Sequence, residues 1–198
     1  MGKASTRGRR GGRAGGASPW LAAAAVVAAA AVALRLQGRL WLCACGRLTP
    51  WVGDAWSADT SQHLFDPYSF THVLHGFAFC GLLALVLPRA GWRWRLLLAV
   101  AAEAAWEVFE NTRYVINRYR ETTAALGYAG DTVVNSLGDI AACALGFLLA
   151  RRLGALRTLL LFAATEVLLL LWIRDSLLLN ILLLLYPSEK LRAWQAGH

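Results

Sequence analysis

Negative charge is scarce in this chain and unevenly placed. Only 12 of the 198 residues are Asp or Glu, against 20 Lys or Arg, and the formal net charge is +8. Three stretches contain basic residues and no acid at all: residues 1–19, 88–95 and 151–157. Basic residues gathered in alternate connections are typical of the cytoplasmic side of membrane proteins. The positive charge therefore indicates membrane topology rather than nucleic-acid binding, and it predicts a cytoplasmic N-terminus.

Motifs of the common enzyme classes are also missing. The chain has no Gly-x-Ser-x-Gly elbow, no phosphate-binding loop and no zinc-protease helix. The Glu-x-x-His pair that marks helical two-metal sites is absent. We find no internal repeat, which argues against a transporter built from two inverted halves. A function has to be inferred from the placement of single residues.

Long apolar runs are what the sequence has in abundance, since 58% of its residues are hydrophobic. A helix needs roughly 20 residues to cross the hydrocarbon core of a bilayer. Five runs approach this length: 20–36, 70–87, 96–111, 131–150 and 158–173. They predict an all-α, polytopic helical membrane protein with about five transmembrane helices and a single membrane domain over residues 19–187.

The ends of the chain differ from this domain. Residues 1–18 are rich in Gly and Arg and predict a disordered basic arm in the cytoplasm. Residues 176–186 form an apolar stretch that is short for an ordinary span, which leaves a re-entrant, an interfacial or a sixth spanning helix as alternatives. Residues 188–198 predict a polar C-terminal tail, and residues 37–69 an external segment.

Acidic side chains interrupt the third apolar run. Glu103, Glu107 and Glu110 are spaced i, i+4 and i+7, so they share one helical face. A charged acid near the bilayer centre costs about 2.5–3.5 kcal/mol on insertion scales. This face is therefore expected to point into the protein or a wet cavity, and it is the first candidate for a functional site.

Other runs carry polar residues at comparable depths. His72 and His75 are spaced i, i+3, and the fourth run places Asp131, Asn135 and Asp139 on one face. Arg174 follows the fifth run. At about 1.5 Å per residue these groups fall in the outer half of the membrane, which predicts a polar cavity open to the periplasm. Three glycines are expected to allow close helix contacts: Gly76, Gly138 and Gly146.

The chemistry of this cluster has several readings. A divalent metal is one, with its ligands drawn from Glu103, Glu107, Glu110, His72 and His75. A carboxyl group acting as general acid or base beside His75 is another, and a proton or ion relay is a third. The remaining alternative is an internal network, including Arg174, that only fixes helix packing.

The four cysteines offer little further information. Cys43 and Cys45 are expected not to pair with each other, because a disulfide between residues i and i+2 is strained. A zinc site of these two residues with His63 lacks the usual Cys-x-x-Cys spacing. Cys80 and Cys143 lie inside apolar runs and are interpreted as small packing residues.

Several short motifs together resemble one bacterial family. They are Leu42-Cys43-Ala44-Cys45-Gly46, Ser61-Gln62-His63-Leu64, His72-x-x-His75-Gly76, Trp106-Glu107-x-x-Glu110-Asn111, Arg118-Tyr119-Arg120, Gly130-Asp131-x-x-x-Asn135-Ser136-x-x-Asp139, Trp172-Ile173-Arg174-Asp175 and Arg192-Ala193-Trp194-Gln195. The chain resembles uncharacterised protein family 0314 over about residues 38–197. The resemblance implies a multi-pass protein of the bacterial inner membrane and carries no established activity or catalytic residue.

The leading hypothesis is a small membrane enzyme or lipid-handling protein for an envelope lipid. Glu107 and Glu110 would act as acid, base or ligand groups with His75 as proton partner, while Asp131 and Asp139 would orient them. Substrate contacts are expected from Arg174, as a clamp for an anionic head group, and from Asn111, Asn135 and Asp131. Membrane lipids are the expected partners, and any cofactor beyond a divalent metal is unknown.

Two alternatives come from other functional classes. An oligomeric transporter or ion pathway would use the same polar groups, as would a structural scaffold within an envelope complex.

Overall fold

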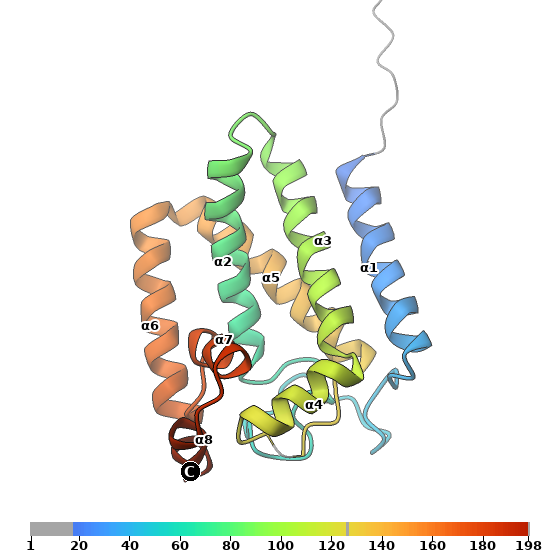
Figure 1. The fold of residues 1–198 in the computed structure, drawn as a ribbon. Helices are drawn as coiled ribbons and strands as arrows, with labels where there is room; N and C mark the ends of the chain where they lie inside the picture. The colour runs from blue at the N-terminus through green and yellow to red at the C-terminus, as the bar shows by residue number, and fades with distance from the viewer. Residues whose placement is uncertain (1–17, 126, 198) are drawn as a thin grey trace, which may run out of the picture.

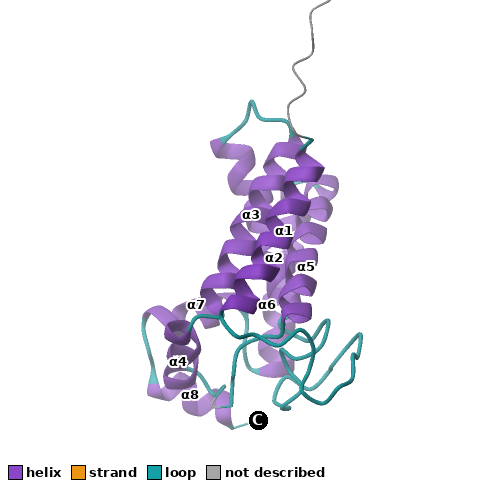
Figure 2. Cartoon of the chain, turned by 90° about the vertical axis from the view of Figure 1, so that its right-hand side faces the viewer, coloured by secondary structure: helices purple, strands orange, loops and turns teal. Residues whose placement is uncertain are grey.

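The computed structural model describes residues 18–125 and 127–197, and all regular structure in these ranges is helical (Figure 2). The all-α prediction is thereby confirmed. The eight described helices are α1 (Pro19–Leu36), α2 (Ser69–Val86), α3 (Trp92–Glu110), α4 (Arg113–Thr122), α5 (Val133–Leu153), α6 (Ala155–Ile173), α7 (Leu177–Leu185) and α8 (Glu189–Ala196). Residues 1–17 of the predicted arm lie outside the described residues.

Five of these helices have 18 to 21 residues. Figure 1 shows that they run up and down in turn. By length and composition α1, α2, α5 and α6 could cross a membrane. α3 is as long, with 19 residues, but it carries the acid stripe and is less apolar. It lies between α2 and α1 (Figure 1). The start of α1 and the arginine-bearing connections α2–α3 and α5–α6 meet at one end of the bundle, while α4, α7, α8 and residues 37–68 gather at the other.

The short C-terminal apolar helix does not span the bundle. α7 has nine residues and is about 14 Å long at 1.5 Å per residue, well under a hydrocarbon thickness of about 30 Å. It lies across the end of the bundle beside α4 (Figure 1). A sixth span is therefore excluded for this segment. The predicted polar tail forms helix α8.

The apolar core lies toward the basic end and between α1, α3 and α5. Ala30, Ala99, Ile140 and Phe147 are buried there among small and branched side chains. Apolar packing of this kind holds the helices together without polar contacts. The polar groups are thus displaced to the other half of the bundle, where the candidate site lies.

Candidate functional site

Two glycines bring α2 and α5 into backbone contact. A Cβ atom on Gly76 would collide with the backbone of Cys143 and Phe147, and one on Gly146 would collide with the backbone of Val73. Gly138 similarly lies against the carbonyl of Leu64. The expected helix contact is confirmed for Gly76 and Gly146, whereas Gly138 lies against a loop. The close approach sets His72 of α2 near the buried carboxylate of Asp139 on α5.

Glu103 of α3 binds both histidines. Nδ1 of His72 lies 2.5 Å from Oε1 of Glu103, and Nδ1 of His75 lies 3.0 Å from each of its oxygens. Glu103 is fully buried and His75 is half-buried. An ionised carboxylate only accepts hydrogen bonds, so both rings carry their hydrogen on Nδ1. In its neutral form, each histidine then has its lone pair on Nε2.

Glu107 of α3 and Asp139 of α5 also approach His72. Oε1 of Glu107 lies 3.3 Å from Nδ1 of His72, and Oδ2 of Asp139 lies 3.8 Å from its Nε2. The other oxygen of Asp139, Oδ1, accepts a hydrogen bond of 2.7 Å from the Ser69 hydroxyl. Within the described chain the ion pairs of these acids come from histidine alone. The group therefore holds more carboxylates than cations.

Asp131 ends the loop before α5 and is held by neutral donors. Its carboxylate accepts hydrogen bonds from Asn111 Nδ2 at 2.7 Å and from the Tyr128 hydroxyl at 3.0 Å. The Asp131 N–H in turn donates to Asn111 Oδ1. Asn111 is thus a structural partner of Asp131. Burial raises the pKa of Tyr128, and the charge of Asp131 raises it further.

A second acidic group lies on another wall of the cavity. Asp175 accepts hydrogen bonds from the Ser176 N–H at 2.9 Å, the Tyr68 hydroxyl at 3.3 Å and Asn180 Nδ2 at 3.2 Å. Burial raises the pKa of Asp175 to about 7, although these hydrogen bonds lower it. The pKa of Tyr68 is also raised, first by burial and then by the charge of Asp175.

Glu166 of α6 fixes the start of α7 beside this group. Its two carboxylate oxygens accept hydrogen bonds from the N–H groups of Leu177 and Leu178, at 3.0 and 3.2 Å. A helix N-terminus has free N–H groups and a partial positive charge, so a carboxylate stabilises it. The buried Glu166 therefore stabilises the N-terminus of helix α7.

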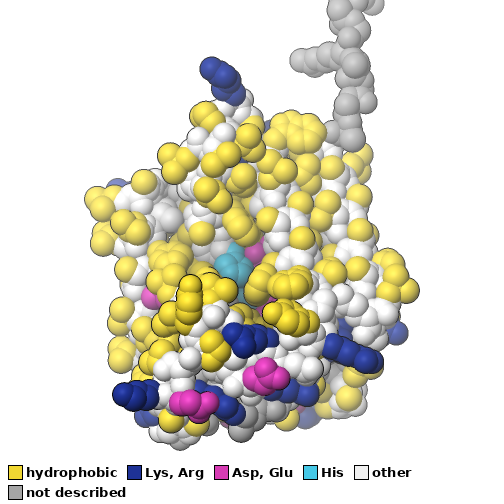
Figure 3. Space-filling model, viewed as in Figure 1, with side chains coloured by type: hydrophobic (Ala, Val, Ile, Leu, Met, Phe, Trp, Pro, Cys, Tyr) yellow, Lys and Arg dark blue, Asp and Glu magenta, His cyan; other side chains and the backbone are white. Residues whose placement is uncertain are grey.

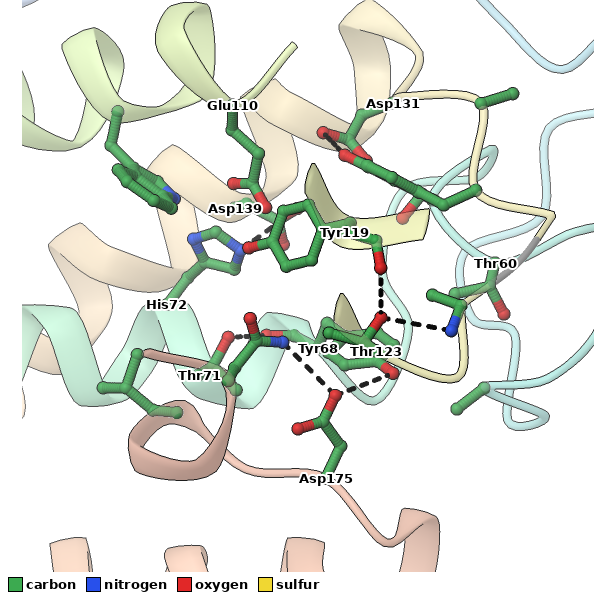
Figure 4. Close-up of a pocket in the computed structure, with 18 of the residues that line it drawn as sticks. Thr60, Tyr68, Thr71, His72, Glu110, Tyr119, Thr123, Asp131, Asp139 and Asp175 are labelled. Carbon is green, nitrogen blue, oxygen red and sulfur yellow. Dashed lines mark hydrogen bonds and ion pairs between the residues drawn. The ribbon is translucent and has the colours of Figure 1, made fainter. Parts of the chain in front are cut away.

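The two groups share one cavity of about 1210 Å³. Figure 4 shows His72, Glu110 and Asp139 on one side of it, Asp131 beyond them, and Tyr68 and Asp175 on another side. Apolar side chains form much of the remaining wall, among them Phe79, Trp106, Phe109, Ile181 and Leu184. No lysine or arginine is among the described residues that line the cavity.

The cavity is visible from the side of the bundle. Figure 3 shows a histidine at the bottom of a hollow in a face that is largely hydrophobic. Of the two histidines that line the cavity, His75 is the more exposed. The polar interior is therefore reached through an apolar surface.

The predicted site residues fall into three sets. His72, His75, Glu103, Glu110, Asp131 and Asp139 line the cavity. Glu107, Asn111 and Asn135 are buried beside it without lining it. Arg174 lies apart: its Nη1 donates to the Trp194 carbonyl at 3.0 Å, and its guanidinium lies over the Trp194 ring. The positive φ of 52° at Arg174 turns the chain there, and Arg174 is not among the lining residues.

Several lining residues were not among the predicted site residues, although two of them, Tyr119 and Asp175, lie in the family motifs. Tyr68, Thr71, Tyr119, Thr123, Tyr128 and Asp175 all line the cavity. They lie in short helices, at helix starts or in connections, where no periodic pattern marks a buried face. Asp175 offered the one available signal, an acid between two apolar runs.

The cysteine prediction was wrong. The Cys43 and Cys45 sulfurs are bonded to each other, with Cα atoms 5.1 Å apart. The chain turns tightly here, since the Gly46 N–H bonds the Cys43 carbonyl and Gly46 has a φ of +73°. This turn brings together two side chains that an extended segment would keep apart. Cys143 is buried and Cys80 half-buried within their helices.

Donor atoms suited to a divalent metal occur in three overlapping groups around the cavity. They are His72–His75–Glu103, His72–Glu107–Asp139 and Glu107–Glu110–Asp131, and within each group the donor atoms lie within 4.8 Å of one another. Imidazole and carboxylate donors together suit divalent transition metals. A fourth group lies in the loop at Cys43, Cys45, Asp59 and His63. There the sulfurs are bonded to each other, and Nδ1 of His63 accepts a hydrogen bond from Thr49.

Comparison with known proteins places the chain among bacterial relatives. It is 46% identical to a UPF0314 protein of Rhizobium meliloti over 182 residues, covering 91% of this chain and 92% of that protein. It is 43% identical to one of Paracoccus denitrificans over 180 residues (91% and 93%), and 44% identical to one of Sphingopyxis alaskensis over 178 residues (90% and 95%). No solved structure matches. The family model described as protein of unknown function DUF2585 matches residues 34–197, and the chain belongs to this family.

Proposed function

We propose that this protein is a membrane enzyme that binds an amphipathic lipid in the cavity and acts on its polar end. The observation that carries the proposal is one cavity lined both by a histidine and carboxylate cluster and by aromatic and aliphatic side chains. Ligand pockets commonly combine a mostly apolar lining with a few converging polar groups. A molecule with a polar head and an apolar chain fits both kinds of lining at once.

The apolar surroundings of the opening support entry from the bilayer. Two of the helices that line it, α2 and α5, are long and apolar, and the hollow lies in a hydrophobic face (Figure 3). A lipid could pass through this face without exposing its chain to water. Since the basic connections lie at the opposite end of the bundle, the positive-inside rule assigns that end to the cytoplasm of a bacterial inner membrane and the cavity to the outer half.

His75 is the residue best placed for proton transfer. It lines the cavity, and its Nδ1 hydrogen is held by Glu103, so Nε2 is free to accept a proton from a bound molecule. Glu103 then stabilises the charged ring, as a buried carboxylate does beside a histidine base. Glu110 and Asp139 line the same wall and would orient the polar end of the lipid.

Lipid retention tests the binding part of this proposal. The full chain would be purified in mild detergent, and co-purified lipids would be identified by mass spectrometry. Ala102→Trp, at a lining position of α3, is expected to reduce the retained lipid several-fold by filling the cavity. Leu98→Trp, one turn away at an exposed position that does not line the cavity, is the matched control. Equal lipid retention in both variants would contradict the proposal.

Chemical conversion tests the enzymatic part. Wild-type protein and His75→Gln would be reconstituted with a total lipid extract of the source membrane and followed by untargeted lipid mass spectrometry. We expect one lipid class to be consumed by the wild type, with a rate at least about 100-fold lower for His75→Gln, as is typical when a general base is removed. Retained lipid with no consumption by the wild type would leave a binding protein and contradict the enzyme. Net movement of lipid between leaflets without conversion would instead indicate a transporter.

A further inference from the structure

The cluster around His72 carries more buried negative charge than its neighbours balance. Glu103, Glu107 and Asp139 are 0%, 1% and 4% exposed. The described residues that form ion pairs with them are His72 and His75. An unpaired carboxylate in a low-dielectric interior is costly, so such groups are paired, protonated or bound to metal.

Hydrogen bonding satisfies Glu103 but leaves Glu107 and Asp139 incomplete. The single Nδ1 hydrogen of His72 goes to Glu103 at 2.5 Å, so it is not available to Glu107 Oε1 at 3.3 Å. Glu107 Oε1 is buried and accepts no hydrogen bond. Oδ2 of Asp139 lies 3.8 Å from Nε2 of His72, too far for a hydrogen bond.

The distance between His72 Nε2 and Asp139 Oδ2 suits an ion between these two atoms. Metal ligands lie about 2.0–2.2 Å from zinc, so two ligand atoms of one ion are at most about 4 Å apart. His72, Glu107 and Asp139 each offer a donor atom within 4.8 Å of the other two, and they come from α2, α3 and α5. Glu103 on Nδ1 of His72 supplies the carboxylate–histidine contact that commonly orients a metal-binding imidazole.

We propose that His72, Glu107 and Asp139 bind a divalent transition-metal cation, with Glu103 as the positioning residue for His72. In the other two groups of donor atoms around the cavity, His72–His75–Glu103 and Glu107–Glu110–Asp131, hydrogen bonds already occupy donor atoms. Both histidines give their Nδ1 hydrogens to Glu103, and Asp131 accepts from Asn111 and Tyr128. This proposal deepens the proposed function and rests on it for the role of the cation, while the binding of the cation is tested separately.

The cation would also define the class of lipid. The cavity lining contains carboxylates and, among the described residues, no lysine or arginine. A bare phosphate or carboxylate head group would be repelled by this wall, whereas a divalent cation beside it supplies the missing positive charge. His72 and Asp139 both line the cavity, so the cation would face the bound molecule. The inferred substrate is therefore an anionic amphiphile.

Elemental mass spectrometry of the purified full chain tests the cation. The protein would carry an affinity tag without histidines and be loaded with Zn²⁺ or Mn²⁺, after which unbound metal is removed by gel filtration. We expect about one equivalent of metal in the wild type and at least a tenfold loss in Asp139→Asn and Glu107→Gln. Asp175→Asn, which changes a buried carboxylate elsewhere in the cavity, is the matched control and should keep the metal. Absence of stoichiometric metal in the wild type, or equal retention in all variants, overturns the proposal.

A second measurement covers variants that fail to fold. The unfolding temperature of the wild type alone would be compared before chelation, after EDTA and after return of the metal. A fall on chelation and recovery on re-addition supports the site, and an unchanged temperature overturns it. The two proposals fail with different results. If the protein retains lipid but no metal, the proposed cation site is wrong. If the wild type and Ala102→Trp both retain metal and neither retains lipid, the proposed lipid binding is wrong.

Discussion

Two acidic groups occupy different walls of one cavity, and they differ in how their oxygens are satisfied. Asp175 accepts from a backbone N–H, a tyrosine hydroxyl and an asparagine amide, so both of its oxygens have donors. Glu107 and Asp139 each keep an oxygen without a hydrogen bond beside His72. Buried polar atoms in proteins are nearly always paired, so a buried carboxylate oxygen without a donor calls for an explanation. The carboxylate of Asp175 is satisfied within the protein, whereas that of Glu107 is not.

Removing Glu103 should have the largest effect on the group around His72. Glu103→Ala takes away the carboxylate that binds both histidines and leaves them buried without it. Loss of one partner of a buried ion pair typically lowers the free energy of unfolding by about 3–5 kcal/mol. Thermal unfolding in detergent would measure this. Glu103→Gln keeps the shape and one acceptor oxygen, so its loss should be smaller. An unfolding temperature equal to that of the wild type in Glu103→Ala would contradict the pairing.

Separating α2 from α5 should disturb the same group by another route. Gly76→Ala places a methyl group against the backbone of α5, and overpacking of this kind costs about 1–3 kcal/mol. Gly81→Ala on the same helix meets no atom and is the matched control, expected to be neutral or slightly stabilising. Unfolding temperature and metal content would be measured together. If both alanine variants behaved alike, the close contact at Gly76 would be refuted.

The Asp175 group should make the stability of the protein depend on pH. Its pKa is raised from 3.8 to about 7 by burial, so the folded state holds its proton more tightly than the unfolded state. The stability from this group is complete below its unfolded pKa and is lost as the pH rises through about 7. Asp175→Asn should weaken the fall in unfolding temperature between about pH 5 and about pH 8. Asp54→Asn, at an exposed carboxylate with no ion pair among the described residues, serves as control, and equal pH profiles for Asp175→Asn and the wild type would count against burial as the cause.

The smallest effect is expected at the start of α7. The Ser176 hydroxyl accepts a hydrogen bond from the Leu179 N–H, and loss of such a cap costs about 0.5–2 kcal/mol. Ser176→Ala should therefore lower the unfolding temperature slightly without changing metal content. Ser188→Ala removes the corresponding cap of α8 and provides the comparison. A loss of metal in Ser176→Ala would show that the two groups are energetically coupled.

Sequence periodicity correctly predicted the features that depend on the geometry of a single helix. The long helices, the shared face of Glu103 and Glu107 and the close contact at Gly76 follow from helical spacing and side-chain size. These features need no knowledge of how distant segments meet.

Features that depend on chain reversal were not predictable in the same way. The turn at Arg174 uses a left-handed conformation without glycine, and it places Arg174 on Trp194 rather than in the cavity. The same turn brings Asp175 to Tyr68, 107 positions away in the chain. The capping of α7 by Glu166 likewise depends on the fold of the C-terminal segment, and a stripe on α6 alone does not reveal it.

The first turn of α5 has a consequence for biosynthesis. The N–H groups of Thr132, Val133 and Val134 donate to the carbonyls of Ser61, Leu40 and Trp41, all in the segment between α1 and α2. These carbonyls leave the ribosome about 70–90 residues before their donors do. The wall that carries Asp139 is therefore completed only after the early segment has been held in place while three further helices are made. The cavity is therefore completed late in folding, and a chain truncated before α5 would present its histidines and glutamates without their enclosure.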